Sequence, residues 1–190
     1  MWRRASGVGQ GAAMSTTSSW LNPLLEVRES EKHGMGVFAR QNIKKGERLA
    51  IFGGDIMWID EIEGLPDPLS DYPMQIEERF VLGRRDAAES EDTDYFNHSC
   101  APCGGFRGQI FLVAMRYIAR AEEVTFDYAM VVSKSVGSNI VFSMECRCGA
   151  PNCRRIITEN DWEIPELQRR YNGFFSQYLQ EKVDSLRERS

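Results

Sequence analysis

The stretch "YFNHSCAPC", Tyr95–Cys103, sets an Asn-His pair beside two cysteines, after an acidic run and before an apolar, strand-like run. Three interpretations are open from these residues alone: ligands of a metal ion, a catalytic Cys/His pair, or a polar part of the core. A nucleophilic Cys100–His98 pair lacks an Asn, Asp or oxyanion partner that the sequence places beside it. The other cysteines of the chain therefore bear most on the choice.

The chain has five cysteines in two groups: Cys100 and Cys103, then Cys146, Cys148 and Cys153. An odd count without a secretory segment argues against a secreted disulfide framework. The downstream three lie in "ECRCGAPNCRR", where Gly149 and Pro151 turn the chain, so three thiolates can converge on one ion. Structural zinc takes four ligands in a tetrahedron. The spacing therefore predicts a zinc site completed from the upstream pair, with a reduced, metal-free cluster as the alternative.

Composition excludes some classes of function. The 190 residues suffice for one domain and a little more, and the net charge is −5. Binding to nucleic acid through bulk charge needs a basic surface, so no direct nucleic-acid contact is expected. An acidic surface favours a cationic partner, such as a lysine-rich peptide. The longest clean apolar run, Ile110–Met115, is far shorter than the roughly 20 residues of a membrane span, so no membrane contact is expected.

The pattern along the chain predicts a mostly β fold with minor α structure. Residues 24–57 and 109–132 contain short β-branched and aromatic runs bounded by turn residues, which are typical of short strands. Residues 58–94 mix Pro, Gly and acids, which indicates an irregular insertion. Residues 39–49 and 114–124 share Ala, Ile, Glu and Leu/Val at identical spacing. They predict two strand–turn–strand units.

The two ends of the chain differ from its middle. From Pro165 onward, apolar positions recur with a period of about 3.6 and predict a helix, with Leu167, Tyr171, Phe175, Tyr178 and Leu186 near one face. This aromatic stripe is a docking surface, which a homodimer through the C-terminal helix could use. Residues 1–20 are rich in Ser, Thr, Gly and Ala, and predict a disordered tail or a short organellar targeting peptide.

Four motifs in this order, "HGMGVFA", "NHSC", "EEVTFDY" and "CRCGAPNC", resemble those of SET-domain protein-lysine methyltransferases with a post-SET zinc segment. The resemblance runs from about Leu24 to Ile157. It implies a SET-domain fold of small β-sheets around a pseudoknot. The division it implies is a tail (1–20), a SET domain (21–140, insertion about 58–94), a post-SET zinc segment (141–162) and a C-terminal helix (163–190).

The resemblance also implies roles for individual residues. In the S-adenosylmethionine site it places Gly34, Met35, Gly36, Asn97 and His98, with Tyr72 as a weaker candidate. In the catalytic channel it places Tyr128 as the catalytic tyrosine, Phe126 at the position that limits methyl number, and Phe52. As zinc ligands it implies Cys100, Cys146, Cys148 and Cys153.

The expected function is S-adenosylmethionine-dependent methylation of a lysine in a basic protein tail, such as a histone, in an intracellular compartment: nucleus, cytoplasm or an organelle. Phe126 lacks the hydroxyl of a Tyr, which favours di- or trimethylation. Departures from the family pattern are Asp94 in place of Arg, Cys103 in place of Asn, Ala121 in place of Gly, and Phe52 in place of Tyr. They keep open an alternative, a catalytically weak peptide-binding or assembly module. A zinc-ribbon nucleic-acid binder is disfavoured by the charge.

Overall fold

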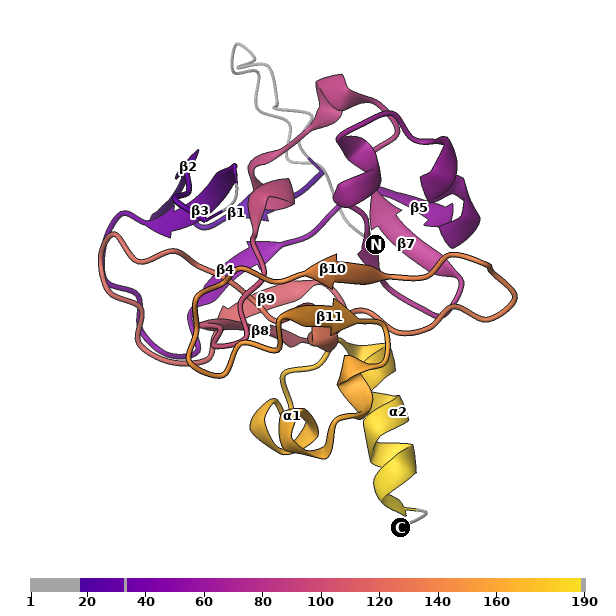
Figure 1. Ribbon diagram of the computed structural model, residues 1–190. Helices are drawn as coiled ribbons and strands as arrows, with labels where there is room; N and C mark the ends of the chain where they lie inside the picture. The colour runs from indigo at the N-terminus through magenta and orange to yellow at the C-terminus, as the bar shows by residue number, and fades with distance from the viewer. Residues whose placement is uncertain (1–17, 33, 189–190) are drawn as a thin grey trace, which may run out of the picture.

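The computed structural model describes residues 18–32 and 34–188. Its described residues form four small antiparallel sheets and two α-helices (Figure 1). The largest sheet has the order β1 (Trp20–Leu21), β4 (Arg48–Ile51), β9 (Phe111–Ala114), β8 (Gly104–Arg107). The others are β2 (Leu25–Glu29) with β3 (Met35–Ala39), β5 (Asp55–Trp58)–β7 (Phe80–Gly83)–β6 (Met74–Gln75), and β10 (Ser143–Glu145) with β11 (Ile156–Thr158).

The main core lies between the four-stranded sheet, the stretch after Tyr95 and the C-terminal helices. Strands β4, β8 and β9 contribute Leu49, Phe106 and Leu112, each with no exposed surface. β8 and β9 pair in register from Gly104–Ala114 to Arg107–Phe111, and β4 pairs with β9 through a register shift between Arg48 and Ala50. The four small antiparallel sheets confirm the prediction of a mostly β fold.

The motif-bearing segments of the chain lie side by side at the centre. His98 and Phe126 form a parallel bridge, and the Ser99 N–H donates to the Phe126 carbonyl at 3.1 Å. Further along, the N–H groups of Cys103 and Gly104 both donate to the Thr125 carbonyl. Two stretches that are separated by more than twenty residues in the sequence are thus fixed against each other by backbone hydrogen bonds.

The insertion is more regular than the composition indicates. β5 pairs with β7, and β7 with β6, so residues 55–83 hold a three-stranded sheet with a small core of Met57, Ile59 and Val81. Short 3₁₀ turns connect the elements: η1 (Ile59–Gly64), η2 (Leu69–Asp71), η3 (Ala87–Glu89), η4 (Asp92–Tyr95), η5 (Tyr128–Met130) and η6 (Asp161–Glu163).

The two matching strand–turn–strand units pack against each other. Ile43 and Ile118 exchange backbone hydrogen bonds of 2.9 and 3.0 Å at the centre of the pair. The equivalent turn positions are Gly46, with φ +84°, and Ala121, with φ +68°. Glycine adopts this left-handed backbone without a steric cost, whereas alanine is strained there.

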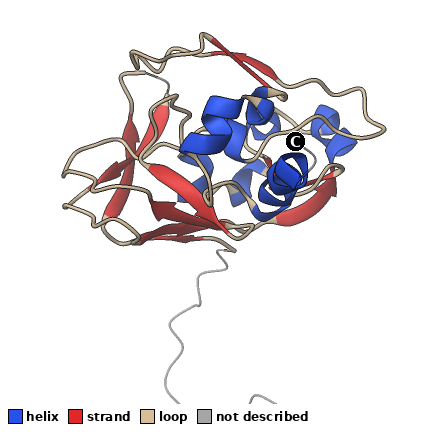
Figure 2. Cartoon of the chain, turned by 90° about the horizontal axis from the view of Figure 1, so that it is seen from below, coloured by secondary structure: helices blue, strands red, loops and turns tan. Residues whose placement is uncertain are grey.

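The predicted C-terminal helix is present but broken. α1 (Pro165–Arg170) and α2 (Gln177–Glu188) are separated by a turn in which Gly173 has φ +77°. Figure 2 shows the helices grouped in the centre and right of the view, with most strands to their left. Apart from Leu186, which is exposed, the aromatic stripe packs on the chain's own core, together with Leu179 and Val183. It therefore offers little surface to a second copy.

The predicted tail falls mostly outside the described residues. Of its last residues, Ser18 and Ser19 donate backbone N–H bonds to Glu91 at 2.7 and 2.8 Å, and Trp20 begins β1. Among the described residues, none of the helices has the length and apolar character that crossing a bilayer requires.

Candidate active site and metal centre

A cavity of about 870 Å³ lies between the central segments, the insertion and the C-terminal hairpin β10–β11. This volume falls within the range of small-molecule sites. Its wall brings together eight residues that the sequence analysis singled out: Gly34, Met35, Phe52, Tyr72, Asn97, His98, Phe126 and Tyr128. Of the predicted metal ligands, Cys146 also lies in this wall.

Gly36 lies just behind the wall rather than in it. A Cβ atom at this position would stand 2.6 Å from Glu123 Oε1 and 3.0 Å from Asn97 Nδ2. Asn97 Nδ2 uses this space to donate to the Met35 carbonyl at 3.0 Å and to Glu123 Oε1 at 2.8 Å. Glycine is therefore required for Asn97 to reach β3, and Glu123, which the sequence analysis did not single out, holds the amide in place.

His98 connects the cavity wall to the cysteine cluster. Its Nδ1 accepts a hydrogen bond from the Tyr128 N–H at 3.2 Å, and its Nε2 lies 3.4 Å from Cys100 Sγ. Because Nδ1 accepts, a neutral imidazole carries its proton on Nε2. His98 is buried, and its ring lies 5.2 Å from the Tyr128 ring. One side chain thus orients both a cavity aromatic residue and a thiol.

Aromatic rings line one part of the cavity. Phe126 lies 5.1 Å from Tyr128 and 6.3 Å from Phe52 between ring centroids, and Phe142 lies 6.3 Å from Tyr128. The Tyr128 hydroxyl donates to the Phe96 carbonyl at 3.3 Å. Burial, with a smaller effect of Asp71, raises the pKa of Tyr128 to about 12, so the hydroxyl stays protonated at neutral pH. Phe142 was not predicted, since it precedes the cysteine motif in a featureless stretch.

Among the described residues, every charged residue in the cavity wall is acidic: Asp71, Asp94 and Glu159. Glu159 is buried and its Oε2 accepts from the Phe142 N–H at 2.7 Å. Asp94, where the family pattern often has Arg, lies 3.8 Å from the buried guanidinium of Arg84. Burial raises the pKa of Asp94. Such a wall favours cationic ligands.

Four of the five cysteines converge. The Sγ atoms of Cys100, Cys146, Cys148 and Cys153 all lie within 4.8 Å of one another, and those of Cys100 and Cys146 are 3.9 Å apart. Zinc–sulfur bonds of about 2.3 Å in a tetrahedron give sulfur–sulfur separations of about 3.8 Å. The cluster is therefore compatible with zinc in both donor set and spacing.

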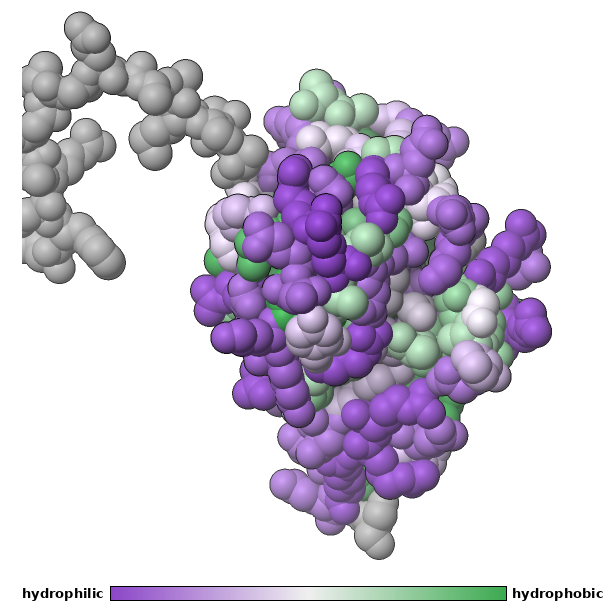
Figure 3. All heavy atoms as spheres, turned by 90° about the vertical axis from the view of Figure 1, so that its left-hand side faces the viewer, coloured by the Kyte–Doolittle hydropathy of each residue, from purple (hydrophilic) through white to green (hydrophobic). Residues whose placement is uncertain are grey.

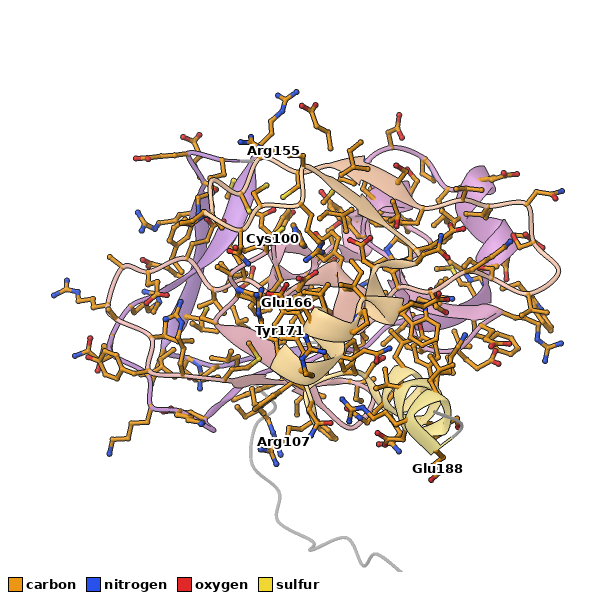
Figure 4. The ribbon with its side chains drawn as sticks, turned by 60° about the horizontal axis from the view of Figure 1, so that its bottom comes forward. Cys100, Arg107, Arg155, Glu166, Tyr171 and Glu188 are labelled. Carbon is orange, nitrogen blue, oxygen red and sulfur yellow. The ribbon has the colours of Figure 1, made fainter. Side chains whose placement is uncertain are left out.

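The thiols differ in acidity. Burial opposes ionisation of Cys148, but the backbone N–H groups of Cys100 and Ala150, together with the thiols of Cys146 and Cys153, lower its pKa to about 6. Burial raises the pKa of Cys100 to about 11 and also raises that of Cys146. A bound divalent cation is what would ionise such thiols. Cys100 lies in the interior, between the loop of Arg155 and Tyr171 at the end of α1 (Figure 4).

Cys103 stands apart from this cluster. Its Sγ faces the carbonyl oxygens of Glu123 and Thr125 at 3.7 and 3.9 Å, and the residue packs in the main core. Burial raises its pKa to about 11. Of the two upstream cysteines, Cys100 is the one brought to the cluster.

A buried ion-pair network ties the cysteine segment to the Tyr128 motif. Arg154, next to Cys153, donates to both oxygens of Asp127 at 2.6 and 2.7 Å and to Asp161 at 2.8 Å. Asp127 has no exposed surface and also accepts from the Tyr171 hydroxyl at 3.0 Å. Neither Asp127 nor Arg154 was singled out from the sequence, because a charged residue in a motif does not reveal its distant partner.

Comparisons with known proteins agree with this geometry. Residues 34–129 match the family model described as SET domain. A variant-silencing SET domain-containing protein of Plasmodium falciparum is 29% identical over 149 residues, covering 68% of this chain and 5% of that protein. Human histone-lysine N-methyltransferase 2B is 31% identical over 143 residues, covering 69% of this chain and 5% of that protein. The chain thus spans a small part of these relatives.

A solved structure extends the likeness to three dimensions. The crystal structure of KRYPTONITE in complex with mCHH DNA, an H3(1-15) peptide and SAH superposes with a TM-score of 0.54 at 25% identity. The match covers 72% of this chain and 30% of that one.

Proposed function

The chain belongs to the SET domain family, and on that premise we propose that it is an S-adenosylmethionine-dependent protein-lysine N-methyltransferase. The observation that carries the proposal is one cavity that combines Asn97 and His98 with the aromatic group of Phe52, Phe126 and Tyr128. The cofactor, when bound, supplies a methyl group on a positively charged sulfur. We assign its binding to Gly34, Met35, Tyr72, Asn97 and His98, with Gly36 behind them.

A lysine amine must lose its proton before it can accept a methyl group. Its usual pKa of about 10.4 makes this cost roughly 4–5 kcal/mol at pH 7. Apolar walls remove water from the ammonium and lower its pKa. Phe52, Phe126 and Phe142 can supply such walls, and their ring faces can hold a methylated ammonium. The Tyr128 hydroxyl, which remains protonated, orients the amine.

We propose a basic protein tail, a histone tail in particular, as the substrate. The carboxylates of the cavity wall fit a lysine-rich segment by charge. The human relative is named for acting on histone lysine, and KRYPTONITE was crystallised with an H3 peptide. The nucleus is the compartment that this substrate implies. We propose zinc as the ion of the four-cysteine cluster, where it would fix β10–β11 beside the cavity.

The proposed product is di- or trimethyllysine. Phe126 has no hydroxyl with which to hold a water or the amine, so space remains for further methyl groups. Mass spectrometry of a methylated peptide at saturating cofactor should find two or three added methyl groups. Phe126→Tyr should shift the product toward one methyl. A wild-type plateau at a single methyl group would contradict this assignment.

In the decisive experiment, the purified protein is incubated with labelled cofactor and a panel of histone-tail peptides. Calorimetry with S-adenosylhomocysteine measures cofactor binding in parallel. Label on lysine in the wild type, with a large loss in Tyr128→Phe, is the expected result. Cofactor binding without transfer to any peptide or to a nuclear extract would favour the weak peptide-binding module, a reading that Phe52 and Asp94 keep open. No binding and no transfer would overturn the proposal.

A further inference from the structure

We propose that the surface formed by residues 40–45 and 116–121, here called the twin-turn patch, binds the phosphate backbone of duplex DNA. Basic residues gather in two segments that lie together, and Glu47 and Glu122 border them. The segments "RQNIKK" and "RYIARA" together carry five Lys and Arg residues and no acidic residue. The whole chain has a net charge of −5, so the remaining residues carry −10. A basic patch on an otherwise acidic protein gives polyanions one face on which to bind.

The backbone under the patch is fixed. Ile43 and Ile118 have no exposed surface and exchange two backbone hydrogen bonds, which joins the two segments at their centres. Asn42 Oδ1 accepts from the Arg120 N–H at 2.9 Å. The two loops run side by side at the left of Figure 1. The cations therefore project from a rigid frame, which limits the ordering cost of binding.

The cations are exposed and partly uncompensated. Arg40 and Arg120 line a surface hollow of about 550 Å³ together with Gln41 and Asn42. Among the described residues, the side-chain cations of Lys44, Lys45 and Arg120 have no carboxylate within 4.0 Å, while the Lys44 backbone N–H donates to Glu47 Oε2 at 3.3 Å. By contrast, Arg116 pairs with Glu122 at 2.6 Å and Arg40 with Glu26 at 3.4 Å. Figure 3 views the molecule from this side, which is predominantly hydrophilic.

Several features favour a phosphate backbone over a protein partner. Protein interfaces are anchored by buried aromatic and aliphatic groups, whereas phosphate contacts need only cations and polar donors. Tyr117 is the only aromatic residue in the two segments, and Gln41 and Asn42 add donors of the kind that contact phosphate and sugar. The cavity cannot serve this purpose, since its charged residues are all carboxylates.

The choice of duplex DNA rests on the proposed function. Histones are wrapped by DNA, so an enzyme that methylates a histone tail works beside duplex phosphates. The overall charge argues against bulk attraction to nucleic acid, and this patch is a local reversal of that charge. With three uncompensated cations, the affinity should fall with salt at a logarithmic slope of about −2.7, or about 40-fold between 50 and 200 mM.

Fluorescence anisotropy of the full chain with a labelled 30-base-pair duplex tests the proposal. K44Q/K45Q/R120Q should lose more than tenfold in affinity at 50 mM salt and flatten the salt slope. The control variant K134Q/R155Q/R169Q removes the same charge from exposed positions outside the patch. It should retain both the affinity for DNA at 50 mM salt and the salt slope. Equal losses in the two variants, or no salt-dependent binding of the wild type, would overturn the inference. Tighter binding of a single-stranded RNA or a polyglutamate peptide would overturn the assignment of duplex DNA.

Peptide methylation separates this inference from the proposed function. The patch variant should methylate a free histone peptide at the wild-type rate, because none of its residues lines the cavity. If the wild type methylates peptides but does not bind DNA, only the present inference fails. If it binds DNA through the patch but methylates nothing, only the proposed function fails.

Discussion

The body of the molecule, residues 20–132, and the hairpin segment 142–162 are held in place by different forces. The body has an extensive apolar core, with Leu49, Phe106 and Leu112 fully buried. The hairpin segment has a small one: in β10–β11, only Ile157 is buried. An isolated two-stranded hairpin is at best marginally stable in water. Its cysteine cluster and the Arg154 ion pairs must therefore supply the order that apolar burial gives the body.

Removing a cysteine of the cluster should separate the hairpin segment from the body most strongly, because it should unfold the first and leave the second folded. Cys148→Ser leaves three sulfur ligands and should release the metal and unfold the hairpin segment, since structural zinc supplies folding free energy. Metal analysis should fall from about one zinc per chain to a small fraction, and hydrogen exchange should rise in residues 142–162 but not in β8–β9. Cofactor binding should be lost with it.

Cys103→Ser is the matched control for that change. It alters a buried thiol three residues from Cys100, outside the cluster, where a hydroxyl can still face the carbonyls of Glu123 and Thr125. The variant should keep its full metal content. Equal metal loss in both variants would mean that the cluster is not the metal site.

Arg154→Ala should have the next largest effect. It leaves the Asp127 carboxylate, which has no exposed surface, without its guanidinium partner, a change that typically costs about 3–5 kcal/mol. The midpoint temperature of thermal unfolding should fall. Methyl transfer should also fall, because Asp127 is the residue before Tyr128 and a shift of Asp127 would displace that tyrosine. Arg155→Ala, one residue further and exposed, should change neither. If the two variants behaved alike, the ion-pair network would not be what joins the two regions.

Tyr128→Phe should leave both regions folded and act on the reaction. Loss of the hydroxyl that orients the amine misplaces the reacting atoms, which can slow a reaction about 10²-fold. The pKa of Tyr128 is raised from 10 to about 12, so the folded state binds its proton more tightly than the unfolded state. This contribution to stability is complete below pH 10 and is lost as the pH rises to about 12. Chemical denaturation across this range should show a smaller alkaline loss in the variant.

Ala121→Gly should have the smallest effect, confined to the body. With φ +68°, Ala121 is strained, and glycine at this turn should stabilise folding by about 1 kcal/mol. Gly46→Ala, at the equivalent turn of the other unit, has free space for its Cβ and should destabilise by a similar amount. Denaturant midpoints should move in opposite directions while the metal content stays constant. Midpoints that moved together would show that backbone strain does not control these turns.

Local chemistry made part of this arrangement predictable. Thiol spacing predicted that Cys146, Cys148 and Cys153 converge, and the motif around Cys100 predicted the fourth thiol; the four sulfurs do lie within 4.8 Å of one another. Long-range partners were not predictable: nothing in "FDY" or "CRR" identifies the Asp127–Arg154 pair. Phe142 and Glu123 reach the site only because the fold brings them there. The helix break at Gly173 was missed because apolar periodicity continues across it, although a glycine inside a helix is a recognised warning.

Cys146 belongs to two sites at once, since its sulfur faces the other three thiols and the residue lines the large cavity. A molecule that fills the cavity would therefore also shield an ion bound by the four cysteines from solvent on one side. Chelators should strip the metal more slowly from the ligand-loaded protein than from the empty one. In such a protein, exhaustion of the small molecule would expose the ion, and metal retention would report on supply of the methyl donor.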